Sequence, residues 1–475
     1  MLAPVRHAIL PGVKYPTIWP YAAAALVTGL LAGCGQVATP AGQVSDISAA
    51  SLAPVGSSQL LLKGTSGYTI AGAQSVPETF SLSLTGQGGA SVNPSSVTLC
   101  AAGANAGDLS VTPVPGQSGE YALQESSSAQ GSDVTVSLEL KSGANCSGSL
   151  VDQAGTSTPL SLPSVTLTQA VFVSVIQGSG SPPIANFVLA YTADGSQLPF
   201  ELTRQDSLNV PEGLAYDPQD QQIYVANYGG GSFSGSVTAY SVSSGAASSS
   251  FSLSSLSQGS TISNPYALAY GLVGGQQQLF VLNSGSGDLL AYSATSGVLS
   301  TNFPAVTSTN GLESTQGIAY DPQNGEIYAA NYQSGSVTAY SASTGIQQAF
   351  NVSSSQADGV AYDPQNQQIY VTNYSSGTPS QSTVTAYAIS SQKSVLTIQG
   401  GLNGAFGIAY DPVNQQIYVA NYGAEANSAG INGTGTNVVS YDASGSPVSL
   451  SGGATSAGAI STKSYGVPQY VLVVP

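Results

Sequence analysis

The stretch GIAYDPVNQQIYVANY at residues 407–422 decides the fold, because related copies of it recur along the chain. The other copies are GLAYDPQDQQIYVANY (213–228), ALAYGLVGGQQQLFVLNS (267–284), GIAYDPQNGEIYAANY (317–332) and GVAYDPQNQQIYVTNY (359–374). Their AY tyrosines lie 54, 50, 42 and 48 residues apart, and each copy is followed by a further short strand pattern of the type SVTAYS. Short strands at this period are typical of propeller blades rather than of helical solenoids.

The two ends of the repeat region complement one another. NFVLAYTADGSQLPFEL (186–202) matches the last two strands of a repeat, and ISTKSYGVPQYVLVVP (460–475) matches the first two. A composite blade built from both ends removes the free sheet edges. We therefore predict an all-β fold with a six-bladed β-propeller over residues 181–475. Seven blades would need VFVSVI (171–176) as part of another blade.

The spacing within the repeats separates a constant turn from a variable loop. The Asp of YDP and the Asn of IYVAN are ten residues apart in four copies, as for Asp217 and Asn227, which indicates a structural hairpin closed by turn-forming side chains. From that Asn to the next Tyr, however, the distance is 13, 9, 14 or 20 residues. In a four-stranded meander these variable loops share a face with the start of each first strand. We expect recognition on that face, unless the variation only reflects tolerated surface insertions.

Residues 1–33 have the pattern of a cleaved secretory leader. Arg6 and Lys14 precede an apolar stretch that runs from about Ile18 to Leu31, and Leu-Ala-Gly-Cys follows at 31–34. This tetrapeptide resembles the lipobox of bacterial lipoproteins, which implies that Cys34 is lipidated and is the first residue of the mature chain. Gly35 at the next position, by the same resemblance, favours the outer membrane or the cell surface.

Between the leader and the repeats we predict two segments. Residues 34–60 are rich in Ala, Ser and Pro without a sustained period, which is typical of a flexible tether. Residues 61–180 alternate polar and apolar residues between Gly, Asn and Ser turns, which predicts a small β-sandwich-like domain. Cys100 and Cys146 lie in it and favour one disulfide in an exported protein, with two reduced, buried cysteines as the alternative.

Composition excludes several functions. Met1, His7 and Trp19 are the only residues of their types and lie in the leader, which excludes a Ser-His-Asp triad and a His-ligated metal from the mature chain. The mature chain keeps 5 basic residues against 23 acidic ones, a formal charge of −18, so nucleic acid and anionic lipid are not expected partners. A chain with so few charged residues depends little on ion pairs, whose strength changes with pH, and it has few side chains that oxidise. This composition suggests exposure to an acidic, oxidising exterior, with drift in the composition of a Ser- and Gly-rich surface protein as the alternative.

The repeats resemble the YVTN and NHL-type β-propeller repeats of bacterial and archaeal surface proteins. The resemblance rests on IYVTNY (369–374), IYVANY (223–228 and 417–422) and the preceding AYDP, and it covers roughly residues 186–475. It implies the fold, but related propellers include lactonases, lyases, dehydrogenase subunits and interaction scaffolds, so it does not select a function.

The gluconolactonase branch of these propellers places metal ligands just before the Gly that opens the first strand. The matching positions here are Glu212, Tyr266, Gln316, Asp358 and Phe406, with Ser461 as the approximate sixth. The resemblance therefore implies a channel in which Glu212 and Asp358 face each other as oxygen ligands for Ca²⁺ or another divalent cation, and Asp358 is a candidate catalytic base. Tyr and Phe cannot complete a cation's shell, so the acids are alternatively plain channel residues. A third alternative is a site for a sugar or small polar ligand stacked on Tyr266 and Phe406.

Together these features predict a lipid-anchored, non-enzymatic binding scaffold at the cell envelope, which meets the membrane only through its lipid. Its partners would be envelope proteins or a small polar or carbohydrate ligand, and no cofactor is required. The alternative is a metal-dependent, lactonase-like hydrolase. A structural or adhesive surface component differs from the scaffold only in its partner.

Overall fold

The computed structural model describes residues 46–474 apart from 57, 65, 73–76, 127–133, 155, 178–184, 230–234, 255–261, 376, 424–436, 451–458 and 463. Cys34 and the predicted leader lie outside the described residues. The described part consists of β-strands and short 3-10 helices, so the predicted all-β class is confirmed. None of its helices has the length and apolar character needed to cross a membrane.

The N-terminal strands form two sheets around one core. The first has the order β1-β4-β8-β7, with β5 on β4, and the second has the order β2-β3-β10-β9-β6. All their pairs are antiparallel except β3 and β10, which run parallel. Apolar side chains of both sheets meet in a shared cluster that includes Phe80, Leu99 and Leu123. The strands are β1 (Ile47–Pro54), β2 (Leu61–Lys63), β3 (Gly67–Ala71), β4 (Glu78–Gly86), β5 (Ser91–Val92), β6 (Val97–Ala102), β7 (Leu109–Pro113), β8 (Glu120–Glu125), β9 (Val134–Ser142) and β10 (Ser164–Thr168).

The predicted tether was wrong over residues 47–54. These residues form β1, which pairs antiparallel with β4, although their Ala and Ser content suggested a linker. Ile47 and Leu52 bury their side chains in the sandwich core, and that burial decides the conformation. Local composition therefore gave the wrong structure because two buried aliphatic side chains outweighed the propensity of the rest.

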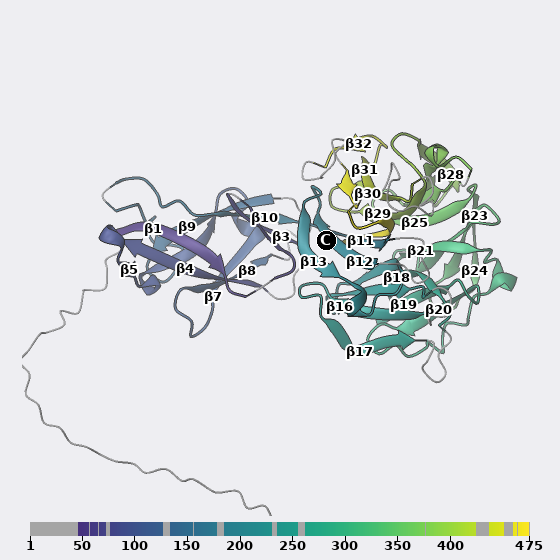
Figure 1. Ribbon diagram of the computed structural model, residues 1–475, viewed down its shortest axis with the longest axis horizontal. Coiled ribbons are helices and arrows are strands. Elements are labelled where there is room, and N and C mark those ends of the chain that lie inside the picture. Colours follow the sequence, from purple (N-terminus) through teal and green to yellow (C-terminus); the bar gives the residue numbers. More distant parts are fainter. Residues whose placement is uncertain are drawn as a thin grey trace, which may run out of the picture. The chain divides into compact units, whose positions relative to one another are not determined.

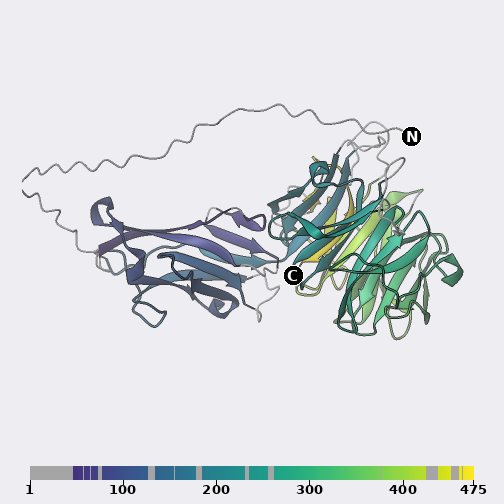
Figure 2. The same cartoon turned by 90° about the horizontal axis from the view of Figure 1, so that it is seen from below.

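Within the described residues, the repeats form six further sheets. Their orders are β13-β12-β11-β34, β14-β15-β16-β17, β18-β19-β20, β21-β22-β23-β24, β25-β26-β27-β28 and β29-β30-β31-β32, with β33 on β31. No single sheet closes on itself in the described residues. Instead the inner strands contact each other in the cyclic order β14, β18, β21, β25, β29, β34 and back to β14. Figures 1 and 2 show the sheets of this part, coloured from teal to yellow, next to one another. This ring of sheets is a propeller-like arrangement.

The strands of this part have the following bounds. They are β11 (Ala170–Gln177), β12 (Ala185–Thr192), β13 (Gln197–Leu202), β14 (Pro211–Asp217), β15 (Gln222–Asn227), β16 (Ser236–Ser241), β17 (Ala247–Ser254), β18 (Pro265–Val273), β19 (Gln276–Asn283), β20 (Asp288–Ser293), β21 (Thr315–Asp321), β22 (Glu326–Asn331), β23 (Ser336–Ser341), β24 (Gln347–Ser353), β25 (Ala357–Asp363), β26 (Gln368–Asn373), β27 (Thr383–Ala388), β28 (Lys393–Ile398), β29 (Ala405–Asp411), β30 (Gln416–Asn421), β31 (Asn437–Asp442), β32 (Pro447–Val448), β33 (Ile460–Ser461) and β34 (Val467–Val474). The 3-10 helices are η2 (Gln87–Gly89), η3 (Pro94–Ser96), η4 (Ala106–Asp108), η5 (Arg204–Asp206), η6 (Ser308–Asn310) and η7 (Pro379–Gln381).

A composite sheet joins the two ends of the repeat region, as predicted. Its last two strands, β12 and β13, lie in the predicted stretch 186–202, but its first two differ from the prediction. β34 supplies the inner strand and β11 the second one, so VFVSVI (171–176) is part of this sheet and not of the sandwich or of a seventh blade. Figure 1 places the C-terminus beside β11 and β12 accordingly. Residues 460–461 instead pair with β31. β11 was misassigned because it is almost wholly buried, so it lacks the alternation and the turn motif of the other second strands.

Each second strand packs two neighbouring sheets together. In β15, Ile223 and Val225 belong to one apolar cluster, whereas Tyr224 and Ala226 belong to the next. The same alternation recurs in the IYVAN strands of the other repeats. Both faces of the sheets are therefore buried, which explains the Ile-Tyr-Val run in the repeat.

The YDP turns have the structural role that the constant spacing predicted. Asp363 is fully buried, and its Oδ1 accepts hydrogen bonds from the backbone N–H groups of Gln365 and Asn366, at 2.9 and 3.0 Å. The Gln365 amide also donates to the carbonyl of Pro412 in the neighbouring sheet. These turns therefore hold adjacent sheets together as well as closing their own hairpins.

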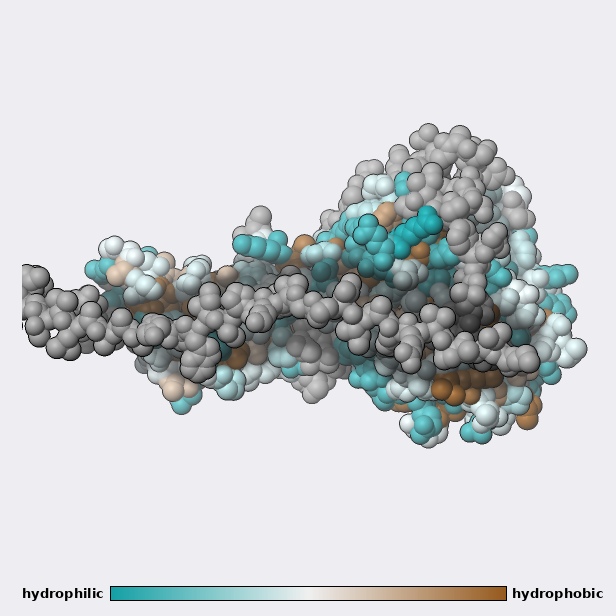
Figure 3. Space-filling view, turned by 60° about the horizontal axis from the view of Figure 1, so that its bottom comes forward, coloured by the Kyte–Doolittle hydropathy of each residue, from teal (hydrophilic) through white to brown (hydrophobic). Residues whose placement is uncertain are grey.

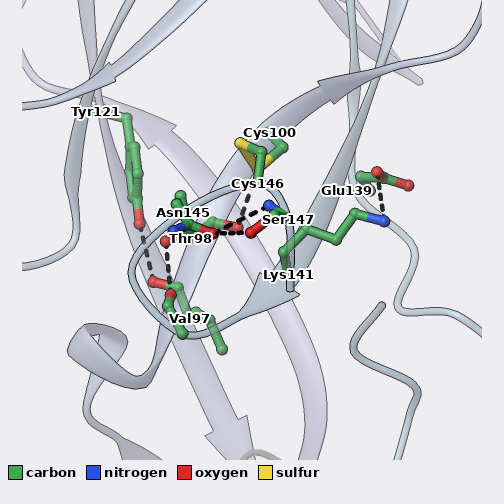
Figure 4. The surroundings of a disulfide bond; sticks show 10 residues. Val97, Thr98, Cys100, Tyr121, Glu139, Lys141, Asn145, Cys146 and Ser147 are labelled. Atoms are coloured by element: carbon green, nitrogen blue, oxygen red, sulfur yellow. Dashed lines mark hydrogen bonds and ion pairs between the residues drawn. A yellow bond between two sulfur atoms is a disulfide. The ribbon is translucent and has the colours of Figure 1, made fainter. Parts of the chain in front are cut away.

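The predicted disulfide is confirmed. Cys100 in β6 and Cys146 after β9 are bonded, with their Cα atoms 5.9 Å apart. Beside them, the hydroxyl of Thr98 donates to the carbonyl of Gly143 at 2.7 Å, and Lys141 forms an ion pair with Glu139 at 2.9 Å (Figure 4). The disulfide thus ties the β9 end to its partner strand within the sandwich.

The described surface is polar with scattered aliphatic side chains. Hydrophilic residues cover much of the coloured area in Figure 3. Val298 and Ile346 are each 65% exposed and follow the glycines of two different turns. Single exposed aliphatic residues of this kind are ordinary on soluble domains.

Candidate functional site

A cavity of about 330 Å³ lies where the inner strands converge. All five channel residues predicted from the sequence line it, together with four that the sequence did not indicate. The lining residues are Glu212, Tyr266, Gln316, Tyr332, Asp358, Tyr374, Phe406, Tyr422 and Gln469. Because the ring of sheets meets at its axis, each inner strand contributes one side chain from its beginning.

The inner strands place these side chains by a common backbone device. Glu212, Tyr266, Gln316, Asp358 and Phe406 are each the second residue of their strand. The residue just before each of these strands has positive φ, between 49° and 69°. Four of the five are not glycine, and Val210 at φ 55° is β-branched, a conformation that costs free energy. The sharp entry turns the second residue of the strand toward the axis.

The asparagines at the ends of the second strands support these entries. Asn227, Asn331 and Asn421 each accept a hydrogen bond from the backbone N–H group two residues before an inner strand, at 2.9, 3.2 and 3.0 Å. Their side chains are buried. The structural role predicted for the repeated Asn is therefore confirmed, and they act on the cavity only by holding its lining strands.

Glycines next to the lining residues bring the inner strands together. A Cβ at Gly213 would lie 2.6 Å from the carbonyl oxygen of Tyr266 on the next strand, and one at Gly359 would lie 2.6 Å from that of Phe406. Gly317 has the same relation to Asp358, at 2.5 Å. These positions require glycine because any side chain would push neighbouring strands apart.

Buried hydroxyls join the inner strands at two further points. Ser174 of β11 donates to the carbonyl of Glu212 at 2.7 Å and accepts from the N–H of Tyr470 at 3.0 Å. Thr372 likewise donates to the carbonyl of Phe406 at 2.6 Å and accepts from the N–H of Gly359 at 2.7 Å. The backbone of the cavity wall is thus hydrogen-bonded, and its carboxylate side chains remain directed into the space.

Two carboxyl groups without protein partners dominate the electrostatics. Glu212 and Asp358 are 7% and 2% exposed, and Glu212 Oε2 and Asp358 Oδ1 are buried atoms with no hydrogen-bond partner. Burial raises the pKa of both groups well above the usual range, and the charge of Asp358 raises that of Glu212 further. None of the nine lining residues is Lys, Arg or His. An ionised pair here would lack a counter-charge.

Aromatic rings form most of the remaining wall. The Tyr266 ring makes edge contacts with Phe406 and Tyr470, at centroid distances of 6.4 and 6.1 Å. Phe406 also packs against Tyr374 and Tyr422, at 6.4 and 5.5 Å. The Tyr470 hydroxyl donates to the carbonyl of Gln316. These mutual contacts make the rings a preformed wall rather than independent side chains.

Sequence reasoning missed Gln469 and three tyrosines. Gln469, and not Ser461, is the sixth axial residue; Ser461 lies in β33 on the outer part of another sheet. Pro468 before Gln469 was an available signal, since Pro211 and Pro265 precede lining residues in the same way. A second available signal was the final Tyr of the NY pairs, because the end of a second strand lies opposite the start of the first. The tyrosines that line the cavity in this way are Tyr332, Tyr374 and Tyr422.

The donor set does not fit a calcium shell. Glu212 and Asp358 provide carboxylate oxygens and Gln316 and Gln469 amide oxygens, whereas Ca²⁺ takes six to eight oxygen ligands. Among the described residues no group of three or more His, Cys, Asp or Glu side chains converges. Since rings occupy the other axial positions, a divalent cation would depend mainly on water for its ligands.

Comparison with known proteins decides neither the fold nor the function. No protein-family model and no curated protein matches the chain. Among solved structures it is similar to a chain of the nidogen/laminin complex, with 12% identity and a TM-score of 0.43, over 65% of this chain and 98% of the other. A Bacteroides fragilis protein named as a candidate 6-phosphogluconolactonase shows the same identity, coverage and TM-score.

A Bacteroides caccae protein of unknown function gives 11% identity and a TM-score of 0.46, over 64% of this chain and 98% of that one. Similarity at this level carries no argument about activity. The fold assignment rests on the ring of sheets. The chain is β-propeller-like.

Proposed function

We propose that the protein is a non-enzymatic binding scaffold that holds a small ligand in the axial cavity, at the face where the variable loops emerge. One observation carries the proposal: two buried carboxyl groups, unpartnered within the protein, face a preformed aromatic cavity. A ligand would supply the missing partners. Membership of the YVTN/NHL-type repeats, a lipid anchor at Cys34 and a cell-envelope location remain part of this proposal.

A larger groove is the weaker candidate. About 490 Å³ in volume, it is lined by neutral side chains such as Gln276, Ser293 and Asn302 around the β18–β19 turn. Its outer position and mixed, open lining provide no charged group that needs a partner. We therefore place the ligand in the axial cavity.

The alternative function is a metal-dependent, lactonase-like hydrolase. Its favouring observation is that Glu212 and Asp358 line one cavity and interact electrostatically, so that one could bind a cation and the other, Asp358, could accept a proton from water. When bound, a divalent cation would polarise a lactone carbonyl or lower the pKa of water. The incomplete oxygen set makes this alternative less well supported than ligand binding.

Thermal-shift screening of a metabolite library tests the binding proposal. The comparison uses three proteins: wild type, Gln316→Trp and Gln276→Trp. Gln316→Trp fills the cavity, and Gln276→Trp adds the same volume at an exposed position after the β18–β19 turn. We expect at least one compound to stabilise wild type and Gln276→Trp but not Gln316→Trp. If the screen finds no such compound and the protein hydrolyses a lactone when Ca²⁺ is added, the hydrolase alternative is favoured.

A further inference from the structure

We infer that the ligand of the axial cavity is an organic ammonium ion, held by the carboxylates of Glu212 and Asp358 and by the surrounding aromatic rings. The inference rests on the proposed function and specifies its ligand class. It follows from three features of the cavity taken together: its acidic side chains, their oxygen atoms without hydrogen-bond donors, and its aromatic lining.

The first step concerns charge. Glu212 Oε2 and Asp358 Oδ1 are acceptor atoms shielded from solvent and left without donors by the protein. No basic side chain lines the cavity. Ionised carboxylates in such a place need a positive partner with hydrogen-bond donors. A protonated amine supplies both at once, since its N–H groups donate and its charge compensates the acids.

The second step concerns the wall. Phe406, Tyr266, Tyr374 and Tyr422 form a connected ring cluster that includes both sides of the cavity. The faces of aromatic rings carry negative electrostatic potential and attract ammonium groups, especially away from water. The rings also accommodate the apolar carbons of an organic cation. A bare metal ion would gain none of this and would lack most of its oxygen ligands.

The third step concerns uncharged ligands. A sugar could stack on Phe406 and donate hydroxyls to the acids, but it would leave their charges uncompensated. Glu212 and Asp358 would then have to remain protonated, and each carboxyl group would have a single O–H to donate to the sugar. A comparison of an organic cation with an uncharged compound of the same shape therefore distinguishes an ammonium ligand from an uncharged one.

Isothermal titration calorimetry on the full mature chain at pH 7.5, in phosphate buffer free of amines, tests this inference. The probes are three cations with their matched neutral compounds: 1,4-diaminobutane with 1,4-butanediol, benzylamine with benzyl alcohol, and choline with 3,3-dimethylbutan-1-ol. CaCl₂ is titrated separately in an amine-free cacodylate buffer. We expect at least one cation to bind at a single site, at least 100-fold more tightly than its neutral match.

The variants are Glu212→Gln/Asp358→Asn, which keeps the side-chain shapes, and Glu201→Gln/Glu313→Gln, which removes the same charge from two exposed positions. We expect the first to weaken cation binding at least 100-fold and the second less than threefold. The wild-type comparison of cation with neutral match remains decisive if the first variant does not fold.

Each other outcome overturns the inference in a recognisable way. Equal binding of a cation and its neutral match, or binding of Ca²⁺ alone, rejects the ammonium ligand but keeps a ligand in the cavity, provided that Gln316→Trp abolishes the binding. If none of the probes binds and the metabolite screen also gives no cavity-dependent ligand, the proposed function fails with it. If no probe binds but the screen finds an uncharged ligand, only the ammonium inference fails.

Discussion

Replacing the two cavity acids with amides should stabilise the ligand-free protein at neutral pH. Burial raises the pKa of Glu212 and Asp358, so the folded state keeps their protons to higher pH than the unfolded chain does. The folded state then binds more protons, and the free energy of unfolding falls as pH rises above the unfolded values. Stability from these groups is complete below about pH 4 and is lost as pH approaches their folded pKa values. The amides of Glu212→Gln/Asp358→Asn do not titrate, so the variant does not lose stability in this way as pH rises.

The ordinary pKa values of 4.5 and 3.8 set a ceiling on the effect. Each pH unit over which only the folded state holds the proton costs about 1.4 kcal/mol. A group that stays protonated at pH 7 therefore costs about 3.5 kcal/mol for Glu212 and about 4.5 kcal/mol for Asp358. We expect the double variant to gain stability at pH 7 relative to pH 3, with about 8 kcal/mol as the ceiling for both groups together.

Urea unfolding from pH 3 to pH 8 measures this gain. The protein is first dialysed into phosphate without amines or divalent cations, and Glu201→Gln/Glu313→Gln reports the effect of exposed charge. The tyrosines around the acids are Tyr266, Tyr332, Tyr374, Tyr422 and Tyr470. Burial raises the pKa of the Tyr266, Tyr422 and Tyr470 phenols, so these three stay neutral throughout. A difference between wild type and Glu212→Gln/Asp358→Asn that is constant within 0.5 kcal/mol across this range would refute the reasoning, because the acids would then be ionised and solvated.

Three further predictions follow from single contacts. Gly359→Ala should lower the thermal midpoint by several degrees or prevent folding, whereas Gly377→Ala, with nothing within 4 Å of its new Cβ, should leave it within 1 °C; equal midpoints would contradict the close strand approach. Cys100→Ala/Cys146→Ala opens a loop with a sequence separation of 46 and should cost about 4 kcal/mol. Urea unfolding should show this loss relative to wild type, and a loss below about 1 kcal/mol would mean that the disulfide adds little to stability. Asn331→Ala removes buried hydrogen bonds to a backbone N–H and to the Thr338 hydroxyl, and urea unfolding should give a loss of about 2 kcal/mol; a loss below 0.5 kcal/mol would mean that water replaces the amide.

The fold and most of the axial residues were predictable because the repeat is a physical unit. The Asp-to-Asn spacing of ten residues defines a hairpin, and its register places the residue before Gly at the start of the inner strand. Applying that register to five copies located Glu212, Tyr266, Gln316, Asp358 and Phe406 correctly in the cavity. What they bind did not follow from the register, because the same axial positions serve different chemistry in different propellers.

The misses occurred where the repeat pattern fails. β11 has no YDP turn, since it enters the composite sheet from a separate part of the chain, and its nearly uniform burial hides the alternation used to recognise strands. Gln469 was missed because Tyr470 stands where four other inner strands have Gly, and Ser174 accepts the resulting N–H. β1 resembled a linker because only Ile47 and Leu52 are deeply buried in it. In each case long-range packing decided the structure.

The most direct test of the central claim is whether cation binding displaces protons from the cavity acids. Wild-type protein and Glu212→Gln/Asp358→Asn are titrated with whichever of the three organic cations binds wild type most tightly. The solution is lightly buffered at pH 6.5, and a pH-indicator dye reports the protons released. Because burial raises the pKa of Glu212 and Asp358, the account predicts saturable release of up to two protons per wild-type chain and none from the variant. Saturable binding without proton release, or equal release from the variant, would contradict it.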